Sequence, residues 1–155
     1  MILENKPLSI KIKGSNNLYL SVTLTDILKC IENGITMKWS ILYLYATGYL
    51  DNNQTMVSFE KNINEAISIT KYSWEEINIL SLKFEQLYGI TLIGAQKEKD
   101  MRRYSKDDDM FKYCDYSIML IDSSYWIIDT FDSRNLRNII EILPGVELLY
   151  PDPTG

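Results

Sequence analysis

The chain has 155 residues, of which 46% are apolar and 24% are charged, and its formal net charge is −5 at pH 7. This apolar content is enough for one domain with a buried core, and it excludes an intrinsically disordered chain. The surplus of acid argues against a direct DNA or RNA binder, because phosphate recognition needs a basic surface that replaces counterions.

The N-terminal part of the chain predicts a β-hairpin followed by a short helix. Residues 8–13 (LSIKIK) alternate apolar and polar side chains, as a half-buried strand does, and 18–24 (LYLSVTL) are expected to form the returning strand. Thr25 can cap a helix that continues through Asn33, and Gly34 is expected to end it in the left-handed conformation.

The next segments predict a strand and two helices. Residues 35–46 are rich in aromatic and β-forming residues, and we expect a strand with two distinct faces. The residues expected on one face are Met37, Trp39, Ile41, Tyr43 and Tyr45, and those expected on the other are Lys38, Ser40, Leu42 and Leu44. Residues 58–67 are expected to form a helix. A second helix begins after Ser73, which forms a capping box with Glu76, and Gly89 is expected to end it.

The C-terminal half predicts paired strands after a charged segment. Residues 90–95 (ITLIGA) are expected in the sheet, whereas 96–114 are dense in charge and are expected at the surface. Strand 116–121 is apolar on both faces, which is typical of a central strand. A tight turn at 122–124 then returns the chain as an antiparallel strand, 125–130.

A last helix and a last strand complete the expected fold. Ser133 is expected to cap the helix, Pro144 and Gly145 to end it, and residues 146–150 (VELLY) to form the strand. Pairs of strands interrupted by single helices are typical of an α+β fold. The sequence therefore predicts a single α+β domain over residues 1–155, with a mainly antiparallel sheet and about three to four helices.

The chain contains no histidine. This removes Ser–His and Cys–His nucleophilic catalysis, histidine general acid–base chemistry and most catalytic zinc sites. Cys30 and Cys114 are not in metal-binding spacing, so two reduced, partly buried thiols are expected. Acidic neighbours should raise the pKa of Cys114. The pair Arg102 and Arg103 is expected to bind neighbouring carboxylates.

Aspartates beside the C-terminal strands are candidates for a metal site. Asp122 and Asp129 could converge across the turn, and Asp115 or the run 107–109 could join them around Mg²⁺ or Mn²⁺. The strand period argues against this, because seven positions separate Asp115 from Asp122 and put them on opposite faces. A metal-dependent hydrolase is therefore the alternative interpretation, and we expect no metal, no other cofactor and no catalytic residue.

Aromatic side chains near these acids indicate a protein-binding surface. Aromatic anchors inside a polar rim are the usual composition of such a surface. The residues expected to contact a partner are Asp107, Asp108, Asp109, Asp115, Asp122, Asp129, Tyr104, Tyr113, Tyr125 and Trp126. Because the acids would supply charge complementarity, the expected partner is a basic protein domain.

Four stretches, MKWSILYLYATGYL, ISITKYSWEEIN, MRRYSKDDDMFKYCD and IDSSYWIID, resemble small immunity proteins of bacterial contact-dependent growth inhibition systems. The resemblance covers roughly residues 35–130. It implies a protein that binds the toxin domain of a large surface-delivered effector and blocks it. Many such toxins are nucleases with a basic substrate groove, and an acidic surface would steer the encounter and occupy the phosphate site.

We therefore expect an acidic cytoplasmic immunity protein that covers the active site of a toxin, with a nuclease as the expected kind. The chain is not expected to bind nucleic acid directly or to enter a membrane, since Lys38 and Ser40 interrupt its longest apolar run. A structural or regulatory module with a merely solvated acidic face is a further interpretation, and the oligomeric state stays open.

Overall fold

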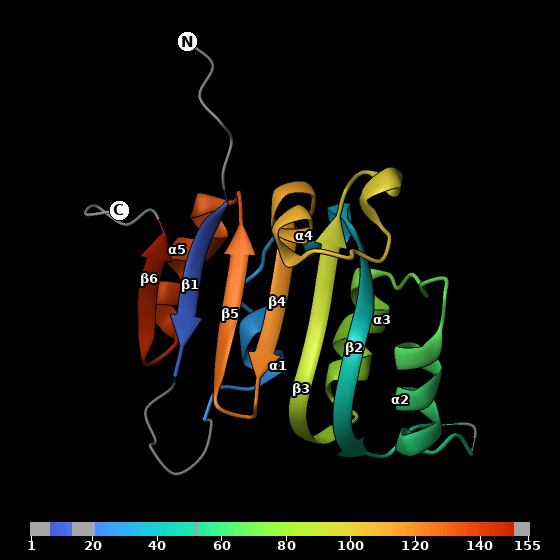
Figure 1. Ribbon diagram of the computed structural model, residues 1–155. Helices are drawn as coiled ribbons and strands as arrows, with labels where there is room; N and C mark the ends of the chain where they lie inside the picture. The colour runs from blue at the N-terminus through green and yellow to red at the C-terminus, as the bar shows by residue number, and fades with distance from the viewer. Residues whose placement is uncertain (1–6, 14–20, 52, 151–155) are drawn as a thin grey trace.

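The computed structural model describes residues 7–13, 21–51 and 53–150, which form one six-stranded antiparallel sheet with helices around it (Figure 1). The sheet order is β2-β3-β4-β5-β1-β6. The strands are β1 (Leu8–Ile12), β2 (Lys38–Gly48), β3 (Phe84–Ala95), β4 (Tyr116–Ile121), β5 (Tyr125–Thr130) and β6 (Val146–Tyr150). The α-helices are α1 (Leu24–Leu28), α2 (Met56–Glu65), α3 (Trp74–Ser81), α4 (Asp107–Tyr113) and α5 (Ser133–Ile142), and the 3₁₀ helices are η1 (Gly34–Thr36) and η2 (Glu98–Asp100). The expected α+β fold with a mainly antiparallel sheet is confirmed.

The helices are distributed unequally over the two faces of the sheet. Helices α1, α3 and α5 lie behind the sheet in the view of Figure 1, whereas α4 covers only the upper part of the front face. Helix α2 lies beside the edge strand β2. The lower front face, over β2, β3 and β4, is thus left bare by the helices of the described chain. None of those helices is long and apolar enough to cross a bilayer.

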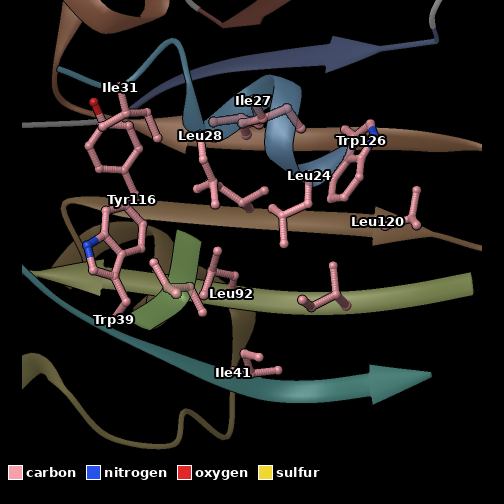
Figure 2. Close-up of a cluster of buried hydrophobic side chains, with 14 of the residues drawn as sticks. Leu24, Ile27, Leu28, Ile31, Trp39, Ile41, Leu92, Tyr116, Leu120 and Trp126 are labelled. Atoms are coloured by element: carbon pink, nitrogen blue, oxygen red, sulfur yellow. The ribbon is translucent and has the colours of Figure 1, made fainter. Parts of the chain in front are cut away.

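The main core lies between the sheet and the helices behind it. Figure 2 shows Leu24 of α1 beside Trp126, and Leu28 of the same helix pointing toward the sheet near Leu92. These four side chains are buried, as is Ile27 of α1. Burying one such aliphatic side chain stabilises the fold by about 1.5–3 kcal/mol. A short helix of this kind is therefore held by its packing rather than by its own propensity.

A smaller apolar cluster holds α4 on the front face. Its buried members are Ile93, Ala95, Met101, Met110 and Cys114. Met110 is the buried residue of α4, whereas Asp107, Asp108 and Lys112 of the same helix are exposed. The segment expected at the surface therefore contributes buried anchors to the fold, although most of its side chains are exposed.

A β-bulge in β2 decides which side chains of that strand face the core. The pairing with β3 shifts between Ile41 and Tyr43, so that Leu42 is an extra residue. Because side chains alternate with a period of two, one extra residue reverses the faces of everything beyond it. Trp39 and Ile41 are buried, whereas Tyr43 and Tyr45 are exposed on the other face. The expectation that all these aromatic residues share one face is wrong for this reason.

Helix α1 begins and ends at residues other than those expected. Thr23, rather than Thr25, caps it in a capping box with Asp26, and the helix ends after only five residues. Gly34 is not in the left-handed region. It is required instead because the Trp74 ring lies against it, where an added Cβ would be only 2.3 Å from a ring carbon.

Two further helix boundaries and one strand also differ. The Ser73–Glu76 capping box is confirmed, but α3 ends at Ser81 and Gly89 lies inside β3. Asp132, rather than Ser133, caps α5. Residues 18–20 of the expected returning strand at 18–24 lie outside the described residues. The expectation is wrong for the rest, because 21–23 are not strand and α1 begins at Leu24.

The outer edge of β2 is covered by side chains and by an isolated bridge. The Asn64 side chain of α2 accepts a hydrogen bond from the Leu44 N–H (2.9 Å) and donates one to the Leu44 carbonyl (2.8 Å). The Ala46 N–H donates to the Glu60 carboxylate (2.6 Å). The remaining contacts join the Leu42 carbonyl to Arg103 and Trp39 to Tyr72. This edge is therefore closed to another strand.

Candidate functional site

An open hollow of about 500 Å³ lies on the bare part of the front face, over β2, β3 and β4. The side chains that matter for its chemistry are Tyr43, Tyr45, Tyr88, Thr91, Met119 and Asp122. We call this surface the tyrosine hollow. It combines three phenol rings, one thioether and one carboxylate, which is the chemistry of a protein-binding surface with aromatic anchors.

The three rings are held in place by contacts with the sheet. Tyr43 lies over Gly89, where an added Cβ would come within 3.0 Å of the ring. Tyr45 packs against Tyr88 with ring centroids 4.8 Å apart. Tyr43 and Tyr45 are 46% and 55% exposed, so about half of each side chain is free to contact another molecule. Because the rings are already ordered, a partner would lose little entropy by binding them.

The turn between β4 and β5 forms one rim of the tyrosine hollow. Asp122 and Ser123 both have positive φ, 48° and 59°, and the Ser124 N–H donates to the Ile121 carbonyl (2.8 Å). This geometry is that of a type I′ hairpin turn, which Asp tolerates better than most residues. The Ser123 N–H donates to the Tyr88 carbonyl (2.9 Å), which fixes the turn to β3. The exposed Asp122 carboxylate is thereby held beside the rings.

The expected acidic residues do not form one continuous surface. The acids at 107–109 make the first turn of α4 at the upper end of the sheet. Asp115 lies at the same end, where its carboxylate accepts a hydrogen bond from the Gln96 N–H (2.8 Å). Asp122 lies at the other end of β4, a strand of six residues, and six residues of strand span about 20 Å. Four acids therefore lie at one end of β4 and Asp122 lies alone at the other, where it adjoins the tyrosine hollow.

Two of the residues expected to contact a partner are buried. Trp126 is 1% exposed in the main core, and its indole N–H donates to the Val22 carbonyl (2.9 Å). Asp129 is 6% exposed and lies between Ser9 and Ser117 on the neighbouring strands. The expectation of surface contacts is therefore wrong for both. Side chains of β5 alternate between the two faces of the sheet. Trp126 lies on the face that packs against the helices, and Asp129 lies on the opposite face, where it is also buried.

Burial raises the pKa of the Asp129 carboxyl, and the serine hydroxyls on either side oppose the rise. Neither Asp129 Oδ2 nor Ser117 Oγ has a hydrogen-bond partner among the described residues. A buried carboxylate without full hydrogen bonding favours its neutral form. This residue is a source of pH-dependent stability rather than a contact for a partner.

The other expected aromatic anchors already contact cations of the same chain. The Arg102 guanidinium lies 4.1 Å from the centre of the Tyr104 ring and 5.6 Å from that of Tyr113. The Lys11 ammonium lies 4.2 Å from the centre of the Tyr125 ring. These cation–π contacts occupy one face of each ring and reduce what it offers to a partner.

The adjacent arginines do not pair with carboxylates of the described residues. Arg102 lies over the tyrosine rings. Arg103 donates from Nη1 to the Leu42 carbonyl (2.8 Å) and from Nη2 to the Ile63 carbonyl. It therefore joins the β2 bulge to the C-terminal part of α2. The expected ion pairs are wrong because tyrosine rings take the place of carboxylates at Arg102, and main-chain carbonyls, which no sequence pattern reveals, take it at Arg103.

The two cysteines are free and fully buried. Burial raises the pKa of Cys114 to about 11, and the charges of Asp100 and Asp115 add to the rise. The expected direction is confirmed, although burial contributes more than the acids do. Burial also raises the pKa of Cys30. Neither thiol is suited to nucleophilic chemistry in the folded protein.

The aspartates considered for a metal site do not converge. Asp122 lies in the turn before β5, and Asp129 is near the far end of the same strand. Within residues 7–13, 21–51 and 53–150, no group of three or more carboxylate or thiol side chains could hold a metal ion. The arrangement that the hydrolase interpretation needs is thus not formed by these residues.

Sequence reasoning missed Tyr43, Tyr45 and Tyr88 as site residues. The adjacent apolar residues Ile41 and Leu42 break the alternation of β2, and this break was the available signal for a bulge.

No protein-family model, curated protein or solved structure matches the chain.

Proposed function

We propose that this chain is an immunity protein that binds a cognate toxin domain, a nuclease, and neutralises it by covering its active site. The observation that carries the proposal is the tyrosine hollow, a set of ordered and half-exposed rings on a bare sheet face. The chain resembles immunity proteins and has a net charge of −5, so the partner that we propose has a basic surface. The protein has no catalytic role in this proposal and acts in the cytoplasm.

The rings of the tyrosine hollow fit the side chains of a basic partner. Among the described residues, no lysine or arginine lies over Tyr43, Tyr45 or Tyr88, in contrast to the three tyrosines that are already paired with cations. An arginine or lysine of the toxin can lie over these ring faces and reach the carboxylate of Asp122. This pairing would occupy the cations that the toxin uses to hold phosphates.

The acids at 107–109 have a different part in the proposal. They lie at the far end of the sheet from the tyrosine hollow, where Asp107 and Asp108 are exposed and Asp109 is half-buried. No hydrogen bond joins their side chains to other described residues. Exposed charges of this kind accelerate the encounter with an oppositely charged partner more than they strengthen the final complex.

The test is co-expression with the toxin domain encoded by the gene directly upstream, in a host that the toxin kills. Wild-type protein should restore growth and should bind the purified toxin domain. The triple variant Tyr43→Ala, Tyr45→Ala, Tyr88→Ala should lose both, while Tyr49→Ala should keep both, because Tyr49 is 80% exposed but lies outside the hollow.

A second set of variants separates the direct contact made by the tyrosine hollow from the electrostatic steering by the acids at 107–109. Neutralising Asp107, Asp108 and Asp109 to Asn should lower the association rate constant and its salt dependence, with the dissociation rate constant unchanged. Full binding by the triple tyrosine variant would refute the docking surface. Absence of a toxin gene upstream, or a toxin unaffected by the wild-type protein, would refute the function.

A further inference from the structure

A cavity of about 170 Å³ lies between strand β2, helix α2 and the segment 66–72 that follows this helix. Hydrogen bonds fix the segment to the strand. The Ser40 hydroxyl donates to the Thr70 carbonyl (2.6 Å), and the main chains of Trp39 and Tyr72 exchange two hydrogen bonds (2.9 and 2.7 Å). The walls of the cavity are therefore already in place before a ligand enters, as in most small-molecule sites.

The lining of this cavity combines apolar side chains with one cation. Its exposed residues are all polar, and Ser68 is one of them. Its buried and half-buried residues are mostly apolar and include Phe59, Ile63 and Ile69. Among the described residues of the lining, Arg103 is the one that carries a charge. An apolar cavity with a few placed polar groups is the usual composition of a small-molecule site.

The guanidinium of Arg103 has N–H groups that the protein does not use. A guanidinium carries two N–H groups on each Nη and one on Nε. Nη1 donates to the Leu42 carbonyl, and Nη2 donates to the carbonyl of Ile63, which itself lines the cavity. Nε is buried and has no hydrogen-bond partner among the described residues. Donors of this side chain are therefore left over at the wall of the cavity.

The positive charge of Arg103 also lacks a counter-ion. No carboxylate within residues 7–13, 21–51 and 53–150 forms an ion pair with it, and the side chain is only partly exposed. Withdrawing a charge from water is costly when no opposite charge accompanies it. Water in the cavity would satisfy the free N–H groups but would leave the charge uncompensated. An anion satisfies both.

We propose that this cavity binds a small organic monocarboxylate. Its two oxygens accept hydrogen bonds from the guanidinium of Arg103, because the planar carboxylate matches the geometry of the guanidinium group. Its short apolar tail packs against Phe59 and Ile69. The volume of the cavity suits a ligand of a few carbon atoms, for which butyrate is the probe.

This inference does not rest on the proposed function. The cavity and the tyrosine hollow share no lining residue among those described. A toxin can therefore bind the hollow whether or not the cavity is filled, and either proposal can fail alone.

The test is a titration of the full, isotope-labelled chain with sodium butyrate at constant ionic strength, followed by NMR. The Nε–H signal of Arg103 and the amide signals of Ile63 and Ser68 should shift and saturate, with a Kd of about 1 mM or tighter. Butyramide has nearly the same shape and no charge, so it should bind at least about tenfold more weakly. Inorganic phosphate should also bind more weakly than butyrate, because it has no apolar tail.

Two variants and their matched controls test the site itself. Ala66→Phe fills the cavity with Arg103 in place and should abolish the shifts, whereas Ile67→Phe should bind as the wild type does, since Ile67 is 97% exposed and outside the lining. Arg103→Gln should abolish binding, and Arg102→Gln should keep it, because Arg102 lies over the Tyr104 ring instead. Since Arg103 also joins β2 to α2, circular dichroism must show that each variant is folded.

The proposal does not depend on the folding of the arginine variant, because Ala66→Phe tests the same cavity. Wild-type signals that do not move with butyrate would overturn it. So would butyramide or phosphate binding as tightly as butyrate, or a folded Ala66→Phe chain that binds butyrate with the wild-type Kd.

Discussion

The side-chain amide of Asn64 hydrogen-bonds to both backbone groups of Leu44, through its oxygen to the N–H and through its nitrogen to the carbonyl. These are the two bonds that a neighbouring strand would make at that position. Helix α2 thus substitutes for a seventh strand. The contact explains why the backbone groups of Leu44 at this edge of the sheet are hydrogen-bonded. It also explains why α2 lies beside the sheet instead of on its face.

Replacing Asn64 by Ala should destabilise the protein by about 1–3 kcal/mol, because two backbone groups of Leu44 lose their partners. Urea unfolding followed by circular dichroism measures the change. Asn62→Ala is the matched control on the same helix, since Asn62 is exposed and its side chain makes no hydrogen bond to another described residue. That variant should remain within about 0.5 kcal/mol of the wild type. Equal losses in the two variants would show that the amide contact contributes nothing.

Gly34→Ala should cost about 1–3 kcal/mol or more, because a methyl group would overlap the Trp74 ring. The midpoint of urea unfolding should fall, and the tryptophan fluorescence spectrum should change. Gly89→Ala is the comparison, since its methyl group would come no closer than 3.0 Å to the half-exposed Tyr43 ring, against 2.3 Å to the Trp74 ring at Gly34. We expect the smaller loss there, and an equal loss would contradict the packing argument.

Asp129→Asn should raise the melting temperature at neutral pH. Because burial raises the pKa of Asp129 in the folded state, the native protein binds a proton that the unfolded chain has already released. Wild-type stability therefore falls as pH rises from the pKa of the unfolded chain through that of the native state. The uncharged asparagine side chain of the variant has nearly the same volume as aspartate and does not titrate, so the variant does not lose this stability as pH rises.

Thermal unfolding across that pH window should show a flatter profile for Asp129→Asn than for the wild type. The control is Asp107→Asn, an exposed residue, whose profile should keep the wild-type shape. A wild-type stability that rises through the same window would refute the assignment of a raised pKa.

Thiol labelling of the native protein should be slow for both cysteines. Burial keeps Cys114 protonated, with a pKa of about 11, and also raises the pKa of Cys30, while each side chain is nearly inaccessible. Labelling with a disulfide reagent should release less than one equivalent in buffer on the time scale in which urea-unfolded protein releases two. Rapid native labelling of one cysteine would show that its cluster opens locally.

The class of fold and several local structures followed from the sequence alone. The capping box of Ser73 and Glu76 is formed as expected, because it depends only on residues three positions apart. Strand β4, apolar on both faces, lies inside the sheet with β3 and β5 on either side. The type of each element depends on hydrophobic period and capping, which are read within one segment.

The candidate site depended instead on contacts between distant segments. The bulge at Leu42 is held by Arg103, which is 61 residues further along the chain, and it turns Tyr43 and Tyr45 out of the core. Asp129 and Trp126 belong to the same segment of acids and aromatic residues as the exposed Asp122, yet both are buried. Sequence patterns assign a side chain to one of two faces, but a single extra residue exchanges them.

What the sequence by itself determined was an acidic, histidine-free α+β chain with its main strands and helices in order. Only the tertiary structure decided which tyrosines are exposed, which aspartates are separated and which sheet edge a helix covers. The reason is physical: helix caps and hydrophobic periods are local interactions, whereas bulge position, burial and edge protection result from hydrogen bonds and packing between residues far apart in the chain.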